Sequence, residues 1–169
     1  MRFVPSFLPL LVAACTSTDP WDGATPLSAD PEGLRAVVEL PEGLVPASTG
    51  SALVFTATRT DLGKRIEQKF GLVQVPSNRG QGYRLSRSEL DNVRQVQSKL
   101  RQWENEAPDQ TQGRVDITIA ACIVSDGPEP DARVSVWVSP GTGAPLVQVA
   151  RNEALEGLVE IQSEPDGCR

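Results

Sequence analysis

The chain has 169 residues, of which 39% are hydrophobic and 22% are charged, and its formal net charge is −6. This composition is typical of a globular protein, and the acidic balance argues against a nucleic-acid partner, because phosphate binding requires a basic surface. The sequence contains no histidine. That absence removes the usual general base at neutral pH, the commonest transition-metal ligand and the Ser-His and Cys-His nucleophile pairs. We therefore expect no cofactor and no metal site.

Residues 1–14 have the features of a secretory signal peptide. Met1-Arg2 gives a positive start, and residues 3–12 form an apolar run that is interrupted by Pro5, Ser6 and Pro9. A helix of this length rises only about 15 Å, half of a bilayer core of roughly 30 Å. The segment is therefore too short for a transmembrane anchor.

The signal ends in Leu11-Val12-Ala13-Ala14-Cys15. This motif resembles the lipobox of bacterial lipoproteins, in which a small residue precedes a cysteine that is acylated before cleavage. The resemblance covers residues 1–15 and implies that Cys15 carries the lipid that anchors the mature chain in a membrane. The alternative is an ordinary secretory signal, since Val12-Ala13-Ala14 also satisfies the small-residue rule of the general signal peptidase. The cysteine count favours the lipobox, because lipidation of Cys15 leaves Cys122 and Cys168 as a pair.

Thr16 follows the cysteine, in place of the aspartate that commonly marks lipoproteins retained in the inner membrane. The resemblance thus implies a lipid-anchored protein of the cell envelope, at the outer membrane and facing the periplasm if the source is Gram-negative. Two or three acyl chains anchor stably, since each buried CH₂ contributes ~0.8 kcal/mol. Residues 16–33 are rich in Pro, Asp, Ser, Thr and Gly. They predict a flexible tether after Cys15, followed by a single globular domain over residues 34–169.

Alternation of apolar and polar residues predicts strands in the first part of this domain. Residues 34–40 alternate in this way before the turn Pro41-Glu42-Gly43. Residues 53–57 and 66–72 flank the turn Thr60-Asp61-Leu62-Gly63, which indicates a β-hairpin. Residues 77–82 have the composition of a loop.

Residues 86–106 form the strongest helix prediction. Ser86 and Glu89 have the spacing of a capping box, in which each side chain bonds to the other residue's backbone N–H. An apolar stripe follows at helical spacing and consists of Leu90, Val93, Val96, Leu100 and Trp103. We expect this helix to lay its stripe on a sheet.

After the helix, residues 115–123 and 134–138 alternate strictly, and residues 146–150 and 158–161 predict shorter strands. The order of strands, one long helix and more strands lacks the repeated βα units of a parallel sheet. It predicts an α+β fold, with an antiparallel sheet of about six to eight strands and one covering helix over about residues 86–106. A β-sandwich with an inserted helix is the alternative.

Cys122 and Cys168 are expected to form a structural disulfide, which on the loop-entropy model contributes roughly 4 kcal/mol. The alternative, a redox-active pair, calls for closer spacing. Arg87, Arg94 and Arg101 recur every seven residues and share one helix face. Such a row suits contact with anionic lipid or lipopolysaccharide phosphates. Alternatively, these arginines cover the edge of the core and pair with Asp91.

No motif in residues 16–169 indicates a catalytic or cofactor-binding arrangement. The sequence therefore favours a membrane-anchored, non-enzymatic binding or assembly module, with membrane lipid and an envelope protein as partners. The alternative is a carboxylate-dependent enzyme acting on a cell-wall or glycan substrate. Such an enzyme requires two carboxyl groups about 5–10 Å apart in a cleft.

Overall fold

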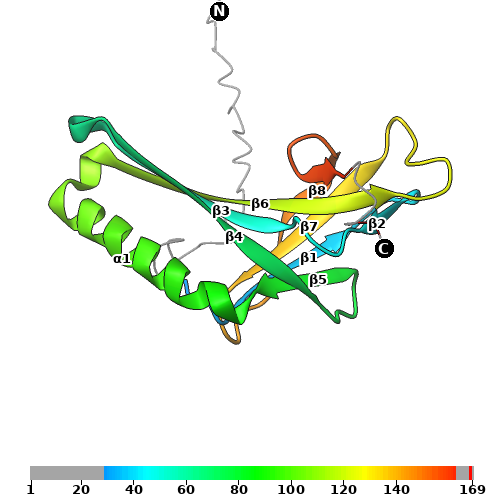
Figure 1. Cartoon of the computed structure of the whole chain (residues 1–169), viewed down its shortest axis with the longest axis horizontal. Coiled ribbons are helices and arrows are strands. Elements are labelled where there is room, and N and C mark those ends of the chain that lie inside the picture. The colour runs from blue at the N-terminus through cyan, green and yellow to red at the C-terminus, as the bar shows by residue number, and fades with distance from the viewer. Residues whose placement is uncertain (1–28, 163–167, 169) are drawn as a thin grey trace, which may run out of the picture.

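A computed structural model describes residues 29–162 and Cys168 (Figure 1). The predicted signal peptide, Cys15 and the first part of the predicted tether lie outside these residues. In chain order the elements are β1 (Leu34–Glu39), β2 (Leu44–Pro46), β3 (Ala52–Arg59), β4 (Lys64–Val75), β5 (Gln81–Leu85), α1 (Leu90–Glu106), β6 (Thr111–Ile123), β7 (Arg133–Pro140), β8 (Val147–Ala154) and β9 (Val159–Ile161).

The strands form one curved, open sheet in the order β2-β6-β3-β4-β5-β1-β7-β8, with β9 paired to β6. Neighbouring strands are antiparallel, except that the short β9 runs parallel to β6. Only residues 155–158 connect β8, at one end of the sheet, to β9 at the other. The sheet must therefore curl so that its two ends approach each other. The predicted α+β class is confirmed, and a single sheet takes the place of the alternative sandwich.

The main core lies on the inner face of the curved sheet. Leu53 and Phe55 of β3, Phe70 of β4 and Tyr83 of β5 belong to one buried cluster. The helix stripe joins the same cluster through Val93, Val96, Leu100 and Trp103. Figure 1 shows α1 lying against the part of the sheet that β3, β4 and β6 form. The predicted covering helix is therefore confirmed.

The predicted capping box does not form. A 3-10 turn over Arg87–Glu89 precedes α1, and its backbone bond joins the Glu89 N–H to the Ser86 carbonyl. This bond uses the amide that the Ser86 hydroxyl would have capped, and the hydroxyl instead lies 2.9 Å from that of Ser88. The Glu89 carboxylate accepts a hydrogen bond from Asn92. The tighter first turn thus replaces the predicted reciprocal cap.

The last residues of the predicted tether pack on the domain. Ala29 is buried, and its carbonyl accepts a hydrogen bond from the Gln97 side chain at 2.9 Å. Asp30 accepts a 2.8 Å hydrogen bond from the Thr142 hydroxyl, and Glu32 forms an ion pair with Arg94. Residues 29–33 therefore belong with the folded part of the chain, which begins ahead of the predicted boundary at residue 34.

Candidate functional site

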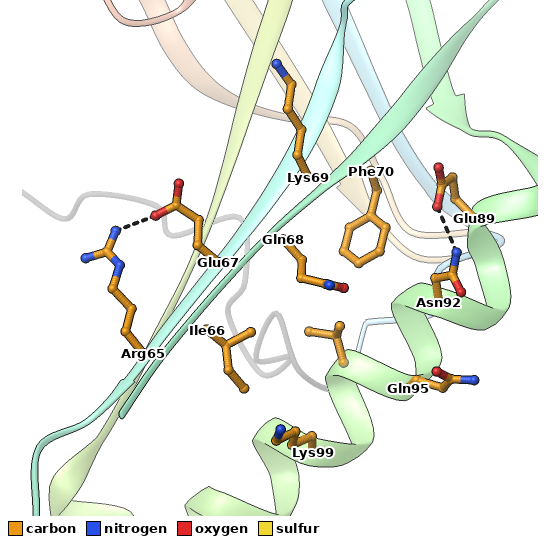
Figure 2. A pocket seen from close by; sticks show the side chains of 11 residues that line it. Arg65, Ile66, Glu67, Gln68, Lys69, Phe70, Glu89, Asn92, Gln95 and Lys99 are labelled. Atoms are coloured by element: carbon orange, nitrogen blue, oxygen red, sulfur yellow. Dashed lines mark hydrogen bonds and ion pairs between the residues drawn. The ribbon is translucent and has the colours of Figure 1, made fainter. Parts of the chain in front are cut away.

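A groove of about 810 Å³ lies between β4 and α1 (Figure 2). One wall is a run of consecutive residues of β4, and the other is the first half of α1 with the turn before it. The lining residues are Arg65, Ile66, Glu67, Gln68, Lys69 and Phe70 on the strand side, and Glu89, Asn92, Gln95, Val96 and Lys99 on the helix side.

The floor of the groove is apolar and rigid. Phe70 and Val96 are both buried members of the main core, and Ile66 packs against the same cluster. The Phe70 ring also meets Phe55 edge to face, with the ring centroids 5.7 Å apart. Because these side chains are held by the core, the groove has a fixed floor that a ligand can contact without first ordering it.

The rim of the groove is polar and carries both signs of charge. Arg65 and Glu67 form an ion pair on β4, and Asn92 donates a 3.2 Å hydrogen bond to Glu89 at the start of the helix wall. The side-chain amides of Gln68 and Gln95 have no hydrogen-bond partner among residues 29–162. Figure 2 shows the Gln68 amide directed toward the helix. The rim therefore offers donors and acceptors on both walls.

Polar contacts in both halves of α1 join the helix to β3 and to residues 29–32. At its C-terminal end, Glu106 pairs with Arg59 of β3, whose guanidinium also bonds Asp61 at 3.1 Å. At its N-terminal half, Arg94 and Gln97 bind residues 29–32, as described above. Arg59 lowers the pKa of Glu106, together with a hydrogen bond from Gln102, and so keeps this carboxylate charged. These contacts tie the helix wall of the groove to β3 and to residues 29–32.

The strand wall of the groove is also an unpaired strand edge. Along one edge, β4 pairs with β3 from Lys64 to Gly71. Along the opposite edge it pairs with β5 only from Leu72 to Val75. In the part of the chain that the structure describes, no strand occupies that second edge over residues 64–70. The groove lies in the space that a longer β5 would have filled.

Two backbone bonds show which groups face this edge. The Leu72 N–H bonds to the Ser51 carbonyl, toward β3, whereas the Gly71 carbonyl accepts the Ser86 N–H on the β5 side. Successive residues of a strand direct their backbone groups to opposite edges. The N–H and C=O groups that face the groove therefore belong to every second residue before Gly71, namely Arg65, Glu67 and Lys69.

None of the three arginines of the predicted row lines the groove, and Arg94 is engaged in ion pairs. Arg94 bonds Asp91 at 3.0 Å and also pairs with Glu32. Arg87 lies in the 3-10 turn ahead of α1, and Arg101 is exposed on the helix. The interpretation in which Arg94 pairs with Asp91 is thus confirmed.

Cys122 and Cys168 lie at disulfide distance, with their Cα atoms 5.6 Å apart, as the sequence predicts. Cys122 forms a small cluster with Ala47 and Ala120, on the face of β6 opposite Ile119 of the main core. The bridge therefore holds Cys168 against the outer face of the sheet, away from the groove. Cys15 lies outside the described residues.

The sequence prediction missed the groove because it missed β5. A detectable signal was present, since Tyr83 and Leu85 alternate with Gly82 and Arg84. Recognising this short strand would have revealed that β4 extends well beyond its neighbour. It would not have placed α1 beside the unpaired part.

Within residues 29–162 and Cys168, no helix has the length and apolar character needed to cross a bilayer. The same residues contain no group of three or more Cys, Asp or Glu side chains arranged to hold a metal ion. Comparison with protein-family models, curated proteins and solved structures gives no match for the chain.

Proposed function

We propose that this protein is a lipid-anchored envelope lipoprotein whose folded domain binds a polypeptide partner in the groove between β4 and α1. The lipobox resemblance at Cys15 supports the anchor. The groove supports the binding role, and it is the observation that carries the proposal. Its apolar floor, its amide groups and its unpaired strand edge together match the chemistry of a polypeptide chain.

The arrangement of carboxylates favours binding over acid–base catalysis. The two carboxylates that line the groove, Glu67 and Glu89, lie on opposite walls, and each is bonded to a neighbour on its own wall. The floor between them is formed by the apolar side chains Ile66, Phe70 and Val96. A binding module uses such a floor for contact area, whereas a glycosidase needs two carboxylates directed at one bond.

The anchor is tested by substituting its cysteine. Cys15→Ala should abolish incorporation of labelled palmitate and leave the unprocessed precursor, since the acylated thiol is what the processing enzyme recognises. Cys122→Ala serves as the matched control and should retain the label. Palmitate incorporation into the Cys15→Ala protein would contradict the proposed anchor.

The binding role is tested by photo-crosslinking in native membranes. A photo-reactive side chain at Gln68 or Gln95 should crosslink the same polypeptide, because these residues lie on opposite walls of the groove. The control position is Ser98, which is exposed on α1 and does not line the groove. Crosslinks that appear equally at Ser98, or that are absent from both walls, would contradict the proposal.

A further inference from the structure

The geometry points to a defined mode of recognition: an extended polypeptide segment adds to the free edge of β4 as a further strand of the sheet. This inference rests on the proposed function of the groove and names the chemistry of its occupant. The segment carries alternating side chains, with acidic, basic and acidic residues on one face and apolar residues on the other.

The backbone of β4 supplies the main interaction. Arg65, Glu67 and Lys69 each direct one N–H and one C=O toward the groove, and an extended chain satisfies such a row with its own backbone groups. Residues 64–70 extend for about 23 Å at 3.3 Å per residue. The helix wall from Glu89 to Lys99 is about 15 Å long. The groove therefore accommodates four or five residues (roughly 15 Å) along the helix, with further pairing beyond it.

The inner side chains of an added strand would meet the floor of the groove. In a paired strand, alternate residues point to each face of the sheet, in register with the neighbouring strand. Ile66 and Phe70 belong to the inner face of β4, and Val96 lies opposite them on α1. Residues of the added strand on this face are thus apolar, and Gln68 and Gln95 lie within reach of polar atoms beside them.

The outer side chains would meet an alternating row of charges. The side chains of Arg65, Glu67 and Lys69 are 61%, 57% and 57% exposed, so they are accessible to a neighbouring strand. Their present ion pairs are with each other or with Glu160. Exposed pairs of this kind contribute little and are readily exchanged. A strand beside them is stabilised by an acidic residue opposite each cation and a basic residue opposite Glu67.

The same charges disfavour indiscriminate pairing of this edge. Charged residues on an edge strand oppose aggregation by disfavouring flat, apolar partners. A row of mixed sign goes further, because a partner with the same order of charges meets repulsion at each position. The edge of β4 is therefore selective for the complementary order.

The test uses a capped heptapeptide, Val-Glu-Val-Lys-Val-Glu-Val, whose symmetric charge order matches either strand direction. Amide hydrogen exchange followed by NMR shows which backbone N–H groups of β4 become hydrogen-bonded. On addition of millimolar peptide, the amides of Arg65, Glu67 and Lys69 should become protected. The amides of Ile66 and Gln68 face β3 and serve as internal controls, because they are already protected in the free protein. Absence of saturable binding would overturn the inference.

Two peptide controls separate strand addition from simple groove binding. In antiparallel pairing the central lysine exchanges both backbone bonds with Glu67, so methylating its backbone nitrogen should weaken binding and methylating the nitrogen of the following valine should have little effect. In parallel pairing the bonds of Glu67 go to the residues that flank the lysine, so the two effects are exchanged. If the peptide binds without new protection of β4 amides, strand addition is wrong while the proposed function stands. If crosslinking in membranes also fails, the proposed function is wrong as well.

The charge order is tested separately by Glu67→Lys. This substitution opposes like charges at the centre of the strand and should weaken binding of the heptapeptide by up to about fivefold. Glu153→Lys makes the same charge change on the exposed part of β8 and should leave binding unchanged. Equal binding of a charge-reversed peptide, Val-Lys-Val-Glu-Val-Lys-Val, to the unsubstituted protein would overturn the proposed order.

Discussion

Tyr83 is the single tyrosine of the chain, and its side chain is almost fully buried, with 1% of the residue exposed. Its hydroxyl has no hydrogen-bond partner in the described part of the chain. The nearby Ser51 hydroxyl already accepts the Ala120 N–H at 3.0 Å. Ser51 lowers the pKa of Tyr83, but by less than burial raises it. The net result is that burial raises the pKa of Tyr83.

We predict that Tyr83→Phe leaves the free energy of unfolding unchanged or raises it by about 1 kcal/mol. The substitution keeps the ring and removes a buried hydroxyl that lacks a partner, and such a group carries a desolvation penalty. Chemical denaturation of both proteins provides the measurement. A loss of more than about 1 kcal/mol would show that the Tyr83 hydroxyl makes a stabilising hydrogen bond.

The raised pKa of Tyr83 also predicts a loss of stability in alkali. Burial disfavours the charged phenolate, so ionisation of Tyr83 costs more in the folded protein than in the unfolded chain. The free energy of unfolding is therefore unaffected by this group below the unfolded pKa of about 10 and falls as pH rises above it. Phenolate absorbance reports Tyr83 alone, and its midpoint should lie above 10 in the folded protein and near 10 in denaturant. The Tyr83→Phe protein should lack this part of the alkaline decline.

At the scale of elements, α1 is held by its apolar stripe, in which Leu100 is 1% exposed. We predict that Leu100→Ala lowers the free energy of unfolding by ~2–5 kcal/mol, because it removes buried contacts and leaves a cavity. Ser98→Ala is the matched control on the exposed side of the helix and should change stability by less than about 0.5 kcal/mol. Equal midpoints for the two variants would show that α1 does not pack as described.

The ion pair between Arg59 and Glu106, which joins β3 to the end of α1, predicts an acid dependence of the helix. The pKa of Glu106 is lowered in the folded state. Its contribution to stability is therefore present above the unfolded value of about 4.3 and is lost as pH falls. Glu106→Gln should lower the free energy of unfolding between pH 6 and 8, where the ion pair is formed, and should match the unsubstituted protein in acid, so that the acid limb of the stability profile becomes flatter. A substituted protein with the same acid limb would contradict this assignment.

At the scale of the whole molecule, the disulfide closes a loop of 46 residues between β6 and the chain end. Replacing both Cys122 and Cys168 by Ala should lower the free energy of unfolding by roughly 4 kcal/mol on the loop-entropy model. The bridge lies on the outer face of the sheet, whereas the groove lies beside α1 on the inner side. The variant should therefore still bind the heptapeptide at temperatures well below its unfolding midpoint. Loss of binding in a folded variant would indicate coupling between the two faces.

Several elements could be predicted from the sequence because their patterns are local. The alternation in residues 53–57 and 66–72 around a turn predicted the hairpin of β3 and β4. The stripe from Leu90 to Trp103 predicted the helix and its buried face, and the cysteine count predicted the pair Cys122 and Cys168. In each case the residues that decide the outcome lie within a few positions of one another, or are too few to pair differently.

The remaining features depend on contacts between distant parts of the chain, and only the tertiary structure decided them. The three-residue β2 and β9 carry too short a pattern to indicate that both pair with β6. The contact between Arg94 and Glu32 spans 62 positions, and it engages the middle arginine of the predicted row. The groove exists because β5 ends opposite Leu72 while β4 continues to Lys64, and because α1 then turns back beside the uncovered edge. Periodicity determined which face of each element is buried, since that depends on neighbours in sequence. Strand pairing determined where an edge stays open, since that depends on which distant segment reaches it.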